Sequence, residues 1–248
     1  MRTAGQDIIA QEDLILSTLL DGKIEMAGQF VFGSNYSFLA NLQLDNLVLE
    51  AVYKPIRGGY PLWDFNLETL PYRELAAYQT SRALKWNFVP PTVVRKDAPY
   101  GVGSIQLFIN HNPEINYFNL DGSDRAGLER VALFDIIINN ADRKGSHILK
   151  DETGYLWLID HGLCFHSDPK MRTVIWDYSG KGIPNNLLED LKSYKENMGL
   201  IDDLRKTFLS NISYAEFEAM QQRIQEILAS RIFPYPEENR RSYPWPLV

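Results

Sequence analysis

The chain has 248 residues, of which 45% are hydrophobic, so it is long and apolar enough to form a core, and a mainly disordered chain is excluded. Its net charge is -7, and it has no run rich in Lys or Arg. Nucleic acids and anionic membranes are therefore not expected as partners, because both bind through basic residues.

The cysteine content and the N-terminal sequence indicate the compartment. Cys164 is the only cysteine and has no partner for an intrachain disulfide, and the first residues lack the apolar core of a signal peptide. The longest apolar run, residues 131–138, is interrupted by Asp135 and is far below the ~20 residues that cross a bilayer. We expect a cytoplasmic protein without insertion into a membrane.

The first part of the chain predicts a small antiparallel sheet with one helix following its first three strands. An initial helix is expected over residues 11–20, because apolar residues lie on one side of it and Gly22 follows. Segments rich in aromatic and β-branched residues, separated by turns, predict strands over residues 28–32, 37–42, 47–53, 92–95 and 104–109. A helix that opens at Pro71 and continues to Leu84 is expected between the third and fourth strands.

The rest of the chain predicts mostly helices. Dense apolar residues predict a buried helix that ends at residue 138, over residues 124–138. Residues 213–216 have the spacing of a capping box and precede apolar residues at helical intervals, which predicts a long C-terminal helix. The proline-rich tail from residue 233 is expected to be an arm that lies on the surface and is packed there rather than functional, given Trp245 and two tyrosines. These elements predict an α+β chain with a strand-rich N-lobe, residues 1–110, and a mostly helical C-lobe, residues 111–248.

A dense run of polar residues, residues 139–150, directly follows the predicted buried helix. Two short strands flank a tight turn at residues 151–154, which predicts a hairpin. The length of this turn predicts that Lys150 lies opposite Tyr155.

With this register His147 lies opposite Leu158, and His147 and Asp160 become diagonal neighbours at the open end of the hairpin. Asp142 lies in the loop just before the first strand, near the same end. Any one of these residues taken alone is better explained as a surface charge or a structural side chain. Two carboxylates and an imidazole together predict a metal-binding or acid-base site.

Residues 140–143 (Asn-Ala-Asp-Arg), His147 and residues 159–162 (Ile-Asp-His-Gly) resemble the catalytic and metal-binding loops of the phosphatidylinositol 3-/4-kinase-like superfamily. The chain also resembles an uncharacterised bacterial family, known chiefly from actinobacteria and Chloroflexi, that is distantly similar to those kinases. The resemblance to the kinases covers roughly residues 28–180. It implies a bilobal protein-kinase-like fold of the atypical PI3/4-kinase type.

The resemblance implies roles for the residues of the C-lobe. Asp142 would orient or deprotonate the acceptor hydroxyl, Arg143 would brace the loop, and Asp160 would hold the metal that bridges the ATP phosphates. His147 stands where the superfamily has a metal-ligating Asn, and imidazole suits borderline metals better than Mg²⁺. The implied cofactors are ATP and Mg²⁺, with Mn²⁺ as an alternative.

In the N-lobe, the resemblance implies that Lys54, at the end of the third strand, contacts the nucleotide phosphates and that Glu74 on the following helix orients it. The other implied nucleotide contacts are Gly33, Ser34, Asn35 and Ser37 in the loop after the first strand, and Phe108 at the junction between the lobes.

The function predicted from these residues is ATP- and divalent-metal-dependent phosphoryl transfer to an acceptor that the sequence does not reveal. A protein or a soluble small molecule is favoured over a lipid, because the chain is acidic and has no basic membrane patch. Transfer of a nucleotidyl group stays open. A nucleotide-binding sensor without turnover ranks second.

A metal-dependent phosphohydrolase that uses His147, His161 and His166 ranks third. Against it, these histidines do not have the spacing of a helical ligand pair, and His161 is expected to point away from Asp160.

Overall fold

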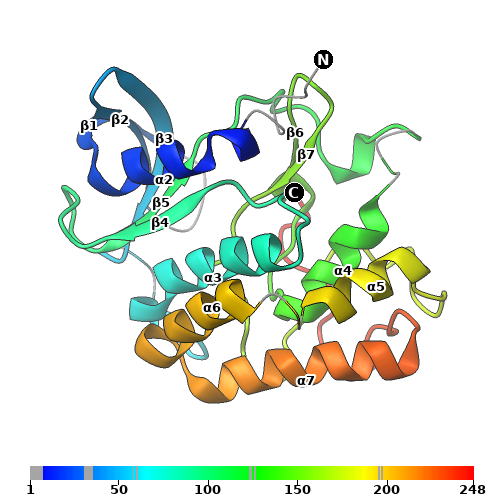
Figure 1. Cartoon of the computed structure of the whole chain (residues 1–248). Helices are drawn as coiled ribbons and strands as arrows, with labels where there is room; N and C mark the ends of the chain where they lie inside the picture. The colour runs from blue at the N-terminus through cyan, green and yellow to red at the C-terminus, as the bar shows by residue number, and fades with distance from the viewer. Residues whose placement is uncertain are drawn as a thin grey trace.

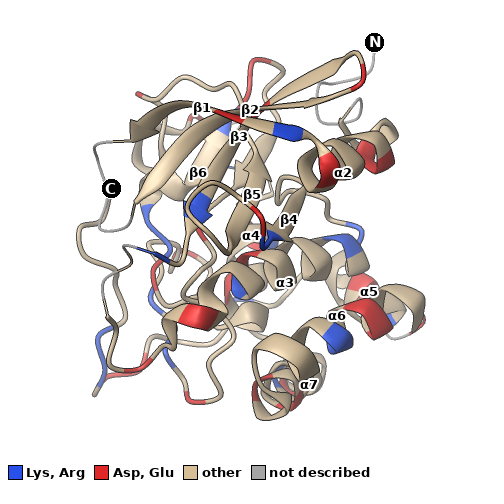
Figure 2. Cartoon of the chain, turned by 90° about the vertical axis from the view of Figure 1, so that its left-hand side faces the viewer, with Lys and Arg blue, Asp and Glu red and all other residues tan. Residues whose placement is uncertain are grey.

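A computed structural model describes residues 8–30, 36–57, 59, 61–122, 125, 127–194, 196 and 198–248. A five-stranded antiparallel sheet and a group of helices make up the molecule, and the sheet lies above the helices in two perpendicular views (Figures 1 and 2). The predicted α+β architecture is therefore confirmed, whereas the lobe boundary at residue 110 stays a prediction.

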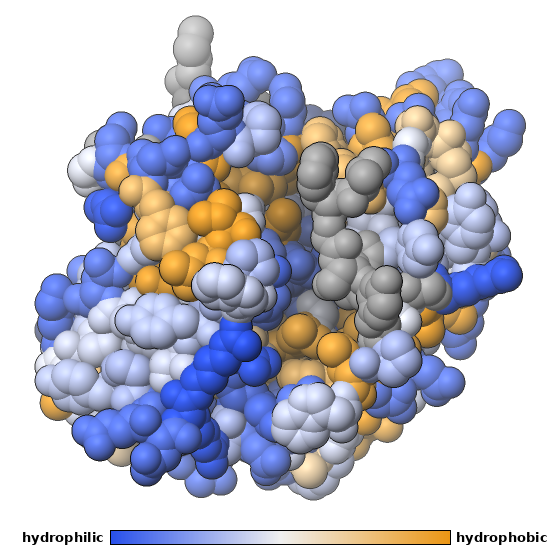
Figure 3. All heavy atoms as spheres, turned by 180° about the vertical axis from the view of Figure 1, so that it is seen from behind, coloured by the Kyte–Doolittle hydropathy of each residue, from blue (hydrophilic) through white to orange (hydrophobic). Residues whose placement is uncertain are grey.

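On the face seen in Figure 3, apolar residues gather near the centre and hydrophilic residues surround them. Among the described helices, none combines the length and the apolar character needed to cross a bilayer.

The sheet has the strand order β1-β2-β3-β5-β4. Its strands are β1 (Lys23–Phe30), β2 (Ser37–Leu44), β3 (Leu47–Pro55), β4 (Thr92–Arg95) and β5 (Gly103–Leu107). The first strand begins at Lys23 rather than at residue 28, because Ile24 and Met26 already pack against the hydrophobic cluster of the sheet. The helix α2 (Glu12–Asp21) lies across the sheet in Figure 1 and buries Ile15 and Leu19 in the same cluster.

The predicted hairpin is present, but its register differs by one residue. Its strands β6 (Ile148–Lys150) and β7 (Leu156–Leu158) place Lys150 opposite Leu156 rather than Tyr155, which corrects the sequence prediction. The cause is Asp151, whose Oδ1 accepts hydrogen bonds from the backbone N of Thr153 and of Tyr155, both at 2.9 Å. Asp151 itself stays opposite Tyr155 as a result, so the turn is shorter than expected.

The helical part contains five helices besides α2 among the described residues: α3 (Leu70–Ala83), α4 (Leu128–Ile138), α5 (Asn185–Tyr194), α6 (Met198–Asn211) and α7 (Tyr214–Ser230). Short 3₁₀ helices are η1 (Leu67–Thr69), η2 (Tyr117–Asn119) and η3 (Gly145–His147). α4 begins at Leu128, and the predicted start at residue 124 lies outside the described residues.

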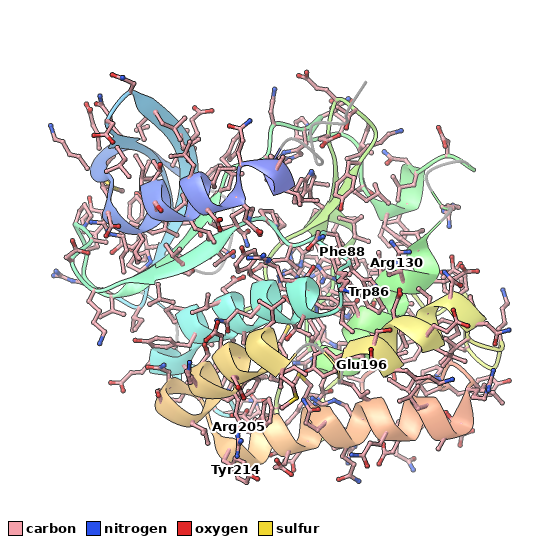
Figure 4. The ribbon with its side chains drawn as sticks, in the orientation of Figure 1. Trp86, Phe88, Arg130, Glu196, Arg205 and Tyr214 are labelled. Carbon is pink, nitrogen blue, oxygen red and sulfur yellow. The ribbon has the colours of Figure 1, made fainter. Side chains whose placement is uncertain are left out.

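Aromatic side chains connect α3 to α4. Trp86 and Phe88 follow α3, and their rings lie 6.3 and 4.9 Å from the ring of Phe134 on α4. Figure 4 shows Trp86 beside Arg130 of α4, and the Arg130 guanidinium carbon lies 6.0 Å from the centre of the Trp86 ring. This packing holds α4 in place, and α4 leads directly into the polar loop at residues 139–147.

The long helix α7 is confirmed, but its predicted capping box is not formed. The Ser213 side chain makes no cap hydrogen bond, and Glu216 instead pairs with Arg73 of α3 at 2.9 Å. Both charged groups are buried, and a buried guanidinium requires an anionic partner. Glu216 therefore joins α7 to α3 rather than capping its own helix.

The C-terminal arm, residues 233–248, does not simply lie on the surface. Ser242 O accepts from Thr173 N at 3.1 Å, and Leu247 O accepts from Gly145 N at 2.7 Å. The chain end consequently lies near the centre of the molecule in Figure 1, against the loop that follows α4. The arm thus reaches the region that the sequence analysis singled out.

Candidate active site

A cavity of about 870 Å³ lies where the sheet, the start of α3, the β6–β7 hairpin and the C-terminal arm meet. A volume of this size accommodates a nucleotide, since small-molecule sites span about 300–1,000 Å³. Lys54, Glu74, Asp142, His147 and Asp160 all line it. The structure therefore brings Lys54 and Glu74 together with the side chains of residues 142–160.

Lys54 lies between two carboxylates. Its Nζ is 2.7 Å from Glu74 Oε1 and 2.9 Å from Asp160 Oδ1. Burial opposes the charge of Lys54, but the two carboxylates outweigh this effect and raise the pKa of its ammonium above the ordinary value. The Lys54 charge in turn holds the pKa of Asp160 far below its usual range. Lys54 and Asp160 are thus both ionised at neutral pH.

Local structure accounts for the position of these charges. Val52 and Lys54 lie on the same face of β3, and both line the cavity. Pro71 lies in the first turn of α3, where proline is favoured, and Glu74 one turn later is buried and contacts Lys54 of β3. Glu74 Oε2 also accepts a hydrogen bond from the backbone N of His161 at 2.9 Å, so the same carboxylate contacts the segment that carries Asp160.

Asp142 lies in the loop after α4, where Asn139 adopts a left-handed φ of 49° and ends the helix. Asn140 Oδ1 accepts from the backbone N of Asp142 at 3.0 Å, and Lys144 Nζ lies 3.4 Å from Asp142 Oδ2. Burial raises the pKa of Asp142 to about 6, while the charge of Lys144 lowers it and that of Asp160 raises it. A carboxyl with this pKa is suited to proton transfer near neutral pH.

Arg143 is fully buried beneath this loop rather than forming a surface ion pair. It pairs with Asp135 of α4 at 3.1 Å and donates to the carbonyl oxygens of His147 and Ile159 at 3.3 and 3.0 Å. A guanidinium with these contacts holds the loop and both ends of the hairpin together. Asp135 was not among the predicted site residues, although a single acid within an apolar helical segment is a signal for a buried counter-ion.

His147 and Asp160 are neighbours in spite of the corrected register. Asp160 has a left-handed φ of 61°, and His147 Nε2 lies 3.3 Å from Asp160 Oδ2. Burial lowers the pKa of His147 to about 4, so the imidazole is neutral at pH 7. A carboxylate and a neutral imidazole fit a divalent cation whose other ligands are phosphate oxygens and water. Within the described parts of the chain, no group of three or more metal-ligating side chains gathers.

The remaining predicted contacts have different outcomes. Ser37, at the start of β2, and Phe108, just after β5, both line the cavity. The predicted phosphate-loop residues Gly33, Ser34 and Asn35 lie outside the described residues.

The other histidines near the motifs serve the structure around the cavity. His161 is fully buried, and its Nε2 lies 2.8 Å from Arg143 Nη2. His166 lies against the ring of Phe65, with a centroid distance of 5.4 Å, and its Nδ1 accepts from the backbone N of Asp168 at 2.9 Å. Of the three histidines weighed for a phosphohydrolase, His147 is the one that lines the cavity.

The C-terminal arm supplies cavity residues that the sequence analysis did not predict. Trp245, Pro246 and Val248 line the cavity beside Lys144 and Ser146. The sequence signal was a tryptophan between two prolines. In the structure 77% of the Trp245 surface is exposed. One wall of the cavity is therefore built from the last residues of the chain.

Comparison with known proteins identifies the family. The family model for phosphatidylinositol 3- and 4-kinase matches residues 65–216, which is more than half of the chain. The chain belongs to this family. The match to the kinase family confirms the resemblance seen in the motifs, and it includes Glu74, Asp142 and Asp160 but neither Lys54 nor the C-terminal arm.

Two individual proteins are similar over most of their length. Protein Rv2133c of Mycobacterium tuberculosis is 36% identical over 265 residues, covering 93% of this chain and 94% of that protein. The crystal structure of a Helicobacter pylori proinflammatory kinase, CtkA, matches with a TM-score of 0.52 and 12% identity, over 87% of this chain and 94% of that one. This structural match confirms the kinase-like fold of this member of the PI3/4-kinase family.

Proposed function

We propose that the chain is an ATP- and divalent-metal-dependent phosphotransferase. The observation that carries this proposal is the position of Lys54, which contacts Glu74 and Asp160 in the same cavity as Asp142. A lysine held by a helix glutamate beside a metal-binding aspartate is the arrangement that kinases use to place ATP phosphates.

In this proposal Lys54 binds and orients the phosphates of ATP, while Glu74 holds Lys54 in position. Asp160 and His147 would hold the divalent cation, which when bound neutralises charge on the phosphates. Asp142 accepts the proton of the acceptor hydroxyl, whose oxygen forms a bond to the γ-phosphorus as the bond to ADP breaks. Its pKa of about 6 leaves Asp142 ionised at neutral pH and ready to take this proton.

The acceptor in this proposal is a protein or a soluble small molecule rather than a lipid. The chain is acidic, with a net charge of -7, so attraction to an anionic membrane surface is weak. Labelled ATP distinguishes phosphoryl transfer from nucleotidyl transfer. A phosphotransferase is expected to place label from the γ-phosphate on the acceptor, whereas a nucleotidyltransferase would place label from the α-phosphate there.

The experiment that tests the proposal measures ATP binding and turnover separately. Lys54→Met is expected to weaken ATP binding about tenfold or more, because a charge-assisted contact contributes about 1.5–3 kcal/mol. Asp142→Asn is expected to keep ATP affinity within about twofold and to lose about 100-fold or more in turnover. Lys206→Met, which removes an exposed lysine on α6, is the matched control and should change neither quantity.

A second candidate is a nucleotide sensor without turnover, and the position of His147 favours it. Its Nε2 lies against Asp160 where the superfamily has an amide ligand, and imidazole is a poor ligand for Mg²⁺. A sensor is expected to bind ATP with metal, to lose that binding in Lys54→Met, and to release no ADP in the wild type or in Asp142→Asn. Turnover in the wild type that Asp142→Asn abolishes would exclude it.

A further inference from the structure

A second cavity, of about 470 Å³, lies between residues 168–172 and the C-terminal arm. Its lining contains four basic side chains, Lys170, Arg172, Arg240 and Arg241, and two acidic ones, Asp168 and Glu237. In Figure 2 several basic positions lie in loops on the same side of the molecule as the chain end. The lining therefore carries an excess of positive charge, although the chain has a net charge of -7.

Two of the four basic side chains are already neutralised. Lys170 Nζ lies 3.3 Å from Asp64 Oδ2 and 4.5 Å from the centre of the Trp63 ring. Arg240 Nε lies 3.1 Å from Glu237 Oε2. These pairs build the wall of the cavity rather than leaving free charge in it.

Arg172 and Arg241 differ, because each is held by a backbone carbonyl and not by a carboxylate. Arg172 Nε donates to Ala141 O at 2.5 Å, and Arg241 Nε donates to Tyr243 O at 3.0 Å. In the described part of the chain, neither guanidinium forms an ion pair. The Nε contact fixes each side chain and leaves its terminal N–H groups to bind both oxygens of a phosphate or a carboxylate.

Arg172 also connects this cavity to the loop that carries Asp142. Its backbone N donates to Asn140 O at 2.8 Å, and its backbone O accepts from Arg143 N at 2.9 Å, so the two segments run side by side. The Arg172 charge also lowers the pKa of Asp142. An anion held by Arg172 therefore lies beside the loop that carries the residue proposed to receive the acceptor proton.

We infer that this cavity is the subsite that binds a phosphate or carboxylate group of a small, soluble acceptor. That the bound molecule is an acceptor rests on the proposed phosphotransfer, whereas the anion site itself rests on Arg172 and Arg241. A cavity of about 470 Å³ is the size of a small-molecule site. Arg241 and the other arm residues that line it lie outside residues 65–216, so the subsite is partly built by a segment that the family match does not cover.

The first test is arginine labelling with phenylglyoxal, read by peptide mass spectrometry at constant ionic strength. Inorganic phosphate is expected to slow labelling of Arg172 and Arg241 by about fivefold or more relative to chloride, because a bound oxyanion occupies their terminal N–H groups. Arg205, an exposed arginine on α6 that Figure 4 labels near the start of α7, is the internal control and should label at the same rate. Equal rates with phosphate and chloride at all three arginines would overturn the inference.

The second test separates this cavity from the nucleotide cavity. Arg241→Gln is expected to weaken phosphate binding about tenfold in calorimetry, whereas Lys54→Met and the matched control Arg205→Gln keep it. Phosphate binding that survives Arg241→Gln and is lost in Lys54→Met would place the anion at the nucleotide site, which overturns the subsite and leaves the proposed function standing.

Protection of Arg241 by phosphate in a protein that binds no ATP would support the anion site while removing the proposed function. Protection by a Glu-rich peptide but not by phosphate or citrate would overturn the small-molecule class.

Discussion

The Nη2 of Arg143 lies 2.8 Å from the Nε2 of His161, and both side chains are fully buried. This contact joins the Asp-Arg loop to the Asp-His-Gly segment. Because Nε2 accepts from Arg143, the ring proton is assigned to Nδ1, which faces Glu74 Oε2 at 3.9 Å. Burial lowers the pKa of His161 well below its ordinary value, so the ring is neutral. At this distance Nδ1 makes no hydrogen bond, and the His161 backbone N, which donates to Glu74 Oε2 at 2.9 Å, provides the link to Glu74 and so to Lys54.

His161→Phe tests the importance of this contact for stability. Phenylalanine has a ring of similar size but cannot accept from Arg143, so one terminal nitrogen of a buried guanidinium loses its partner. The expected loss in the free energy of unfolding is about 1–3 kcal/mol, measured by urea denaturation. His166→Phe, which changes a partly exposed imidazole, is the control and is expected to cost less than about 1 kcal/mol. Equal losses in the two variants would contradict the prediction.

The ionisation of Asp142 is expected to be visible near neutral pH. Its carboxyl is predicted to titrate at about pH 6, and carbon NMR of the carboxyl group, assigned with Asp142→Asn, measures this value directly. Because the folded protein keeps this proton to a higher pH than the unfolded chain, the contribution of Asp142 to stability falls as the pH rises from about 4 to about 6. Phosphotransfer is expected to fall about tenfold for each pH unit below that pKa.

Two substitutions are expected to move this pKa in opposite directions. Lys144→Met removes the cation 3.4 Å from Asp142 Oδ2 and should raise the pKa. Asp160→Asn removes a like charge and should lower it. A shift of the same sign in both variants would refute the electrostatic explanation.

Trp245 is expected to report nucleotide binding. It lines the large cavity and is 77% exposed, so a bound nucleotide changes the surroundings of its indole ring. ATP with metal should change the tryptophan fluorescence of the wild type, and Trp245→Phe should remove most of this change. Trp63→Phe is the matched control, because Trp63 is 89% exposed and lies outside the lining of that cavity. Loss of the signal in Trp63→Phe instead would show that the arm does not border the nucleotide.

Gly103→Ala is expected to disturb the strand that carries Lys54. A Cβ at Gly103 would lie 2.5 Å from Lys54 O and 2.8 Å from Pro55 Cα, and neither backbone atom moves without shifting β3. The expected loss is about 1–3 kcal/mol or more in the free energy of unfolding, together with weaker ATP binding. Gly28→Ala in β1 is the control, since a Cβ there meets nothing within 4 Å. If both variants unfold at the same urea concentration as the wild type, the prediction that β3 leaves no room for a Cβ at Gly103 is wrong.

The elements that depend on neighbouring residues were predictable from the sequence. The strand over residues 92–95 was placed with its observed bounds, because prolines precede it and a turn follows it. The helix that opens at Pro71 and the long helix after Ser213 were placed within about one or two residues, as local capping and periodicity allow. Short motifs at residues 140–143 and 159–162 carried the family resemblance in the same way.

Other features were decided only by the tertiary structure. The hairpin register depended on the side chain of Asp151, and the burial of Arg143 depended on a counter-ion one helix earlier. The contact between Gly145 and Leu247 joins residues at opposite ends of the C-terminal half and creates one wall of the cavity. Local spacing specifies backbone conformation, whereas such long-range contacts form only when distant segments pack together and exclude water. The sequence by itself therefore determined the family and those elements that local capping and periodicity mark, but not the helices α5 and α6. Packing between distant segments decided which side chains share the cavities.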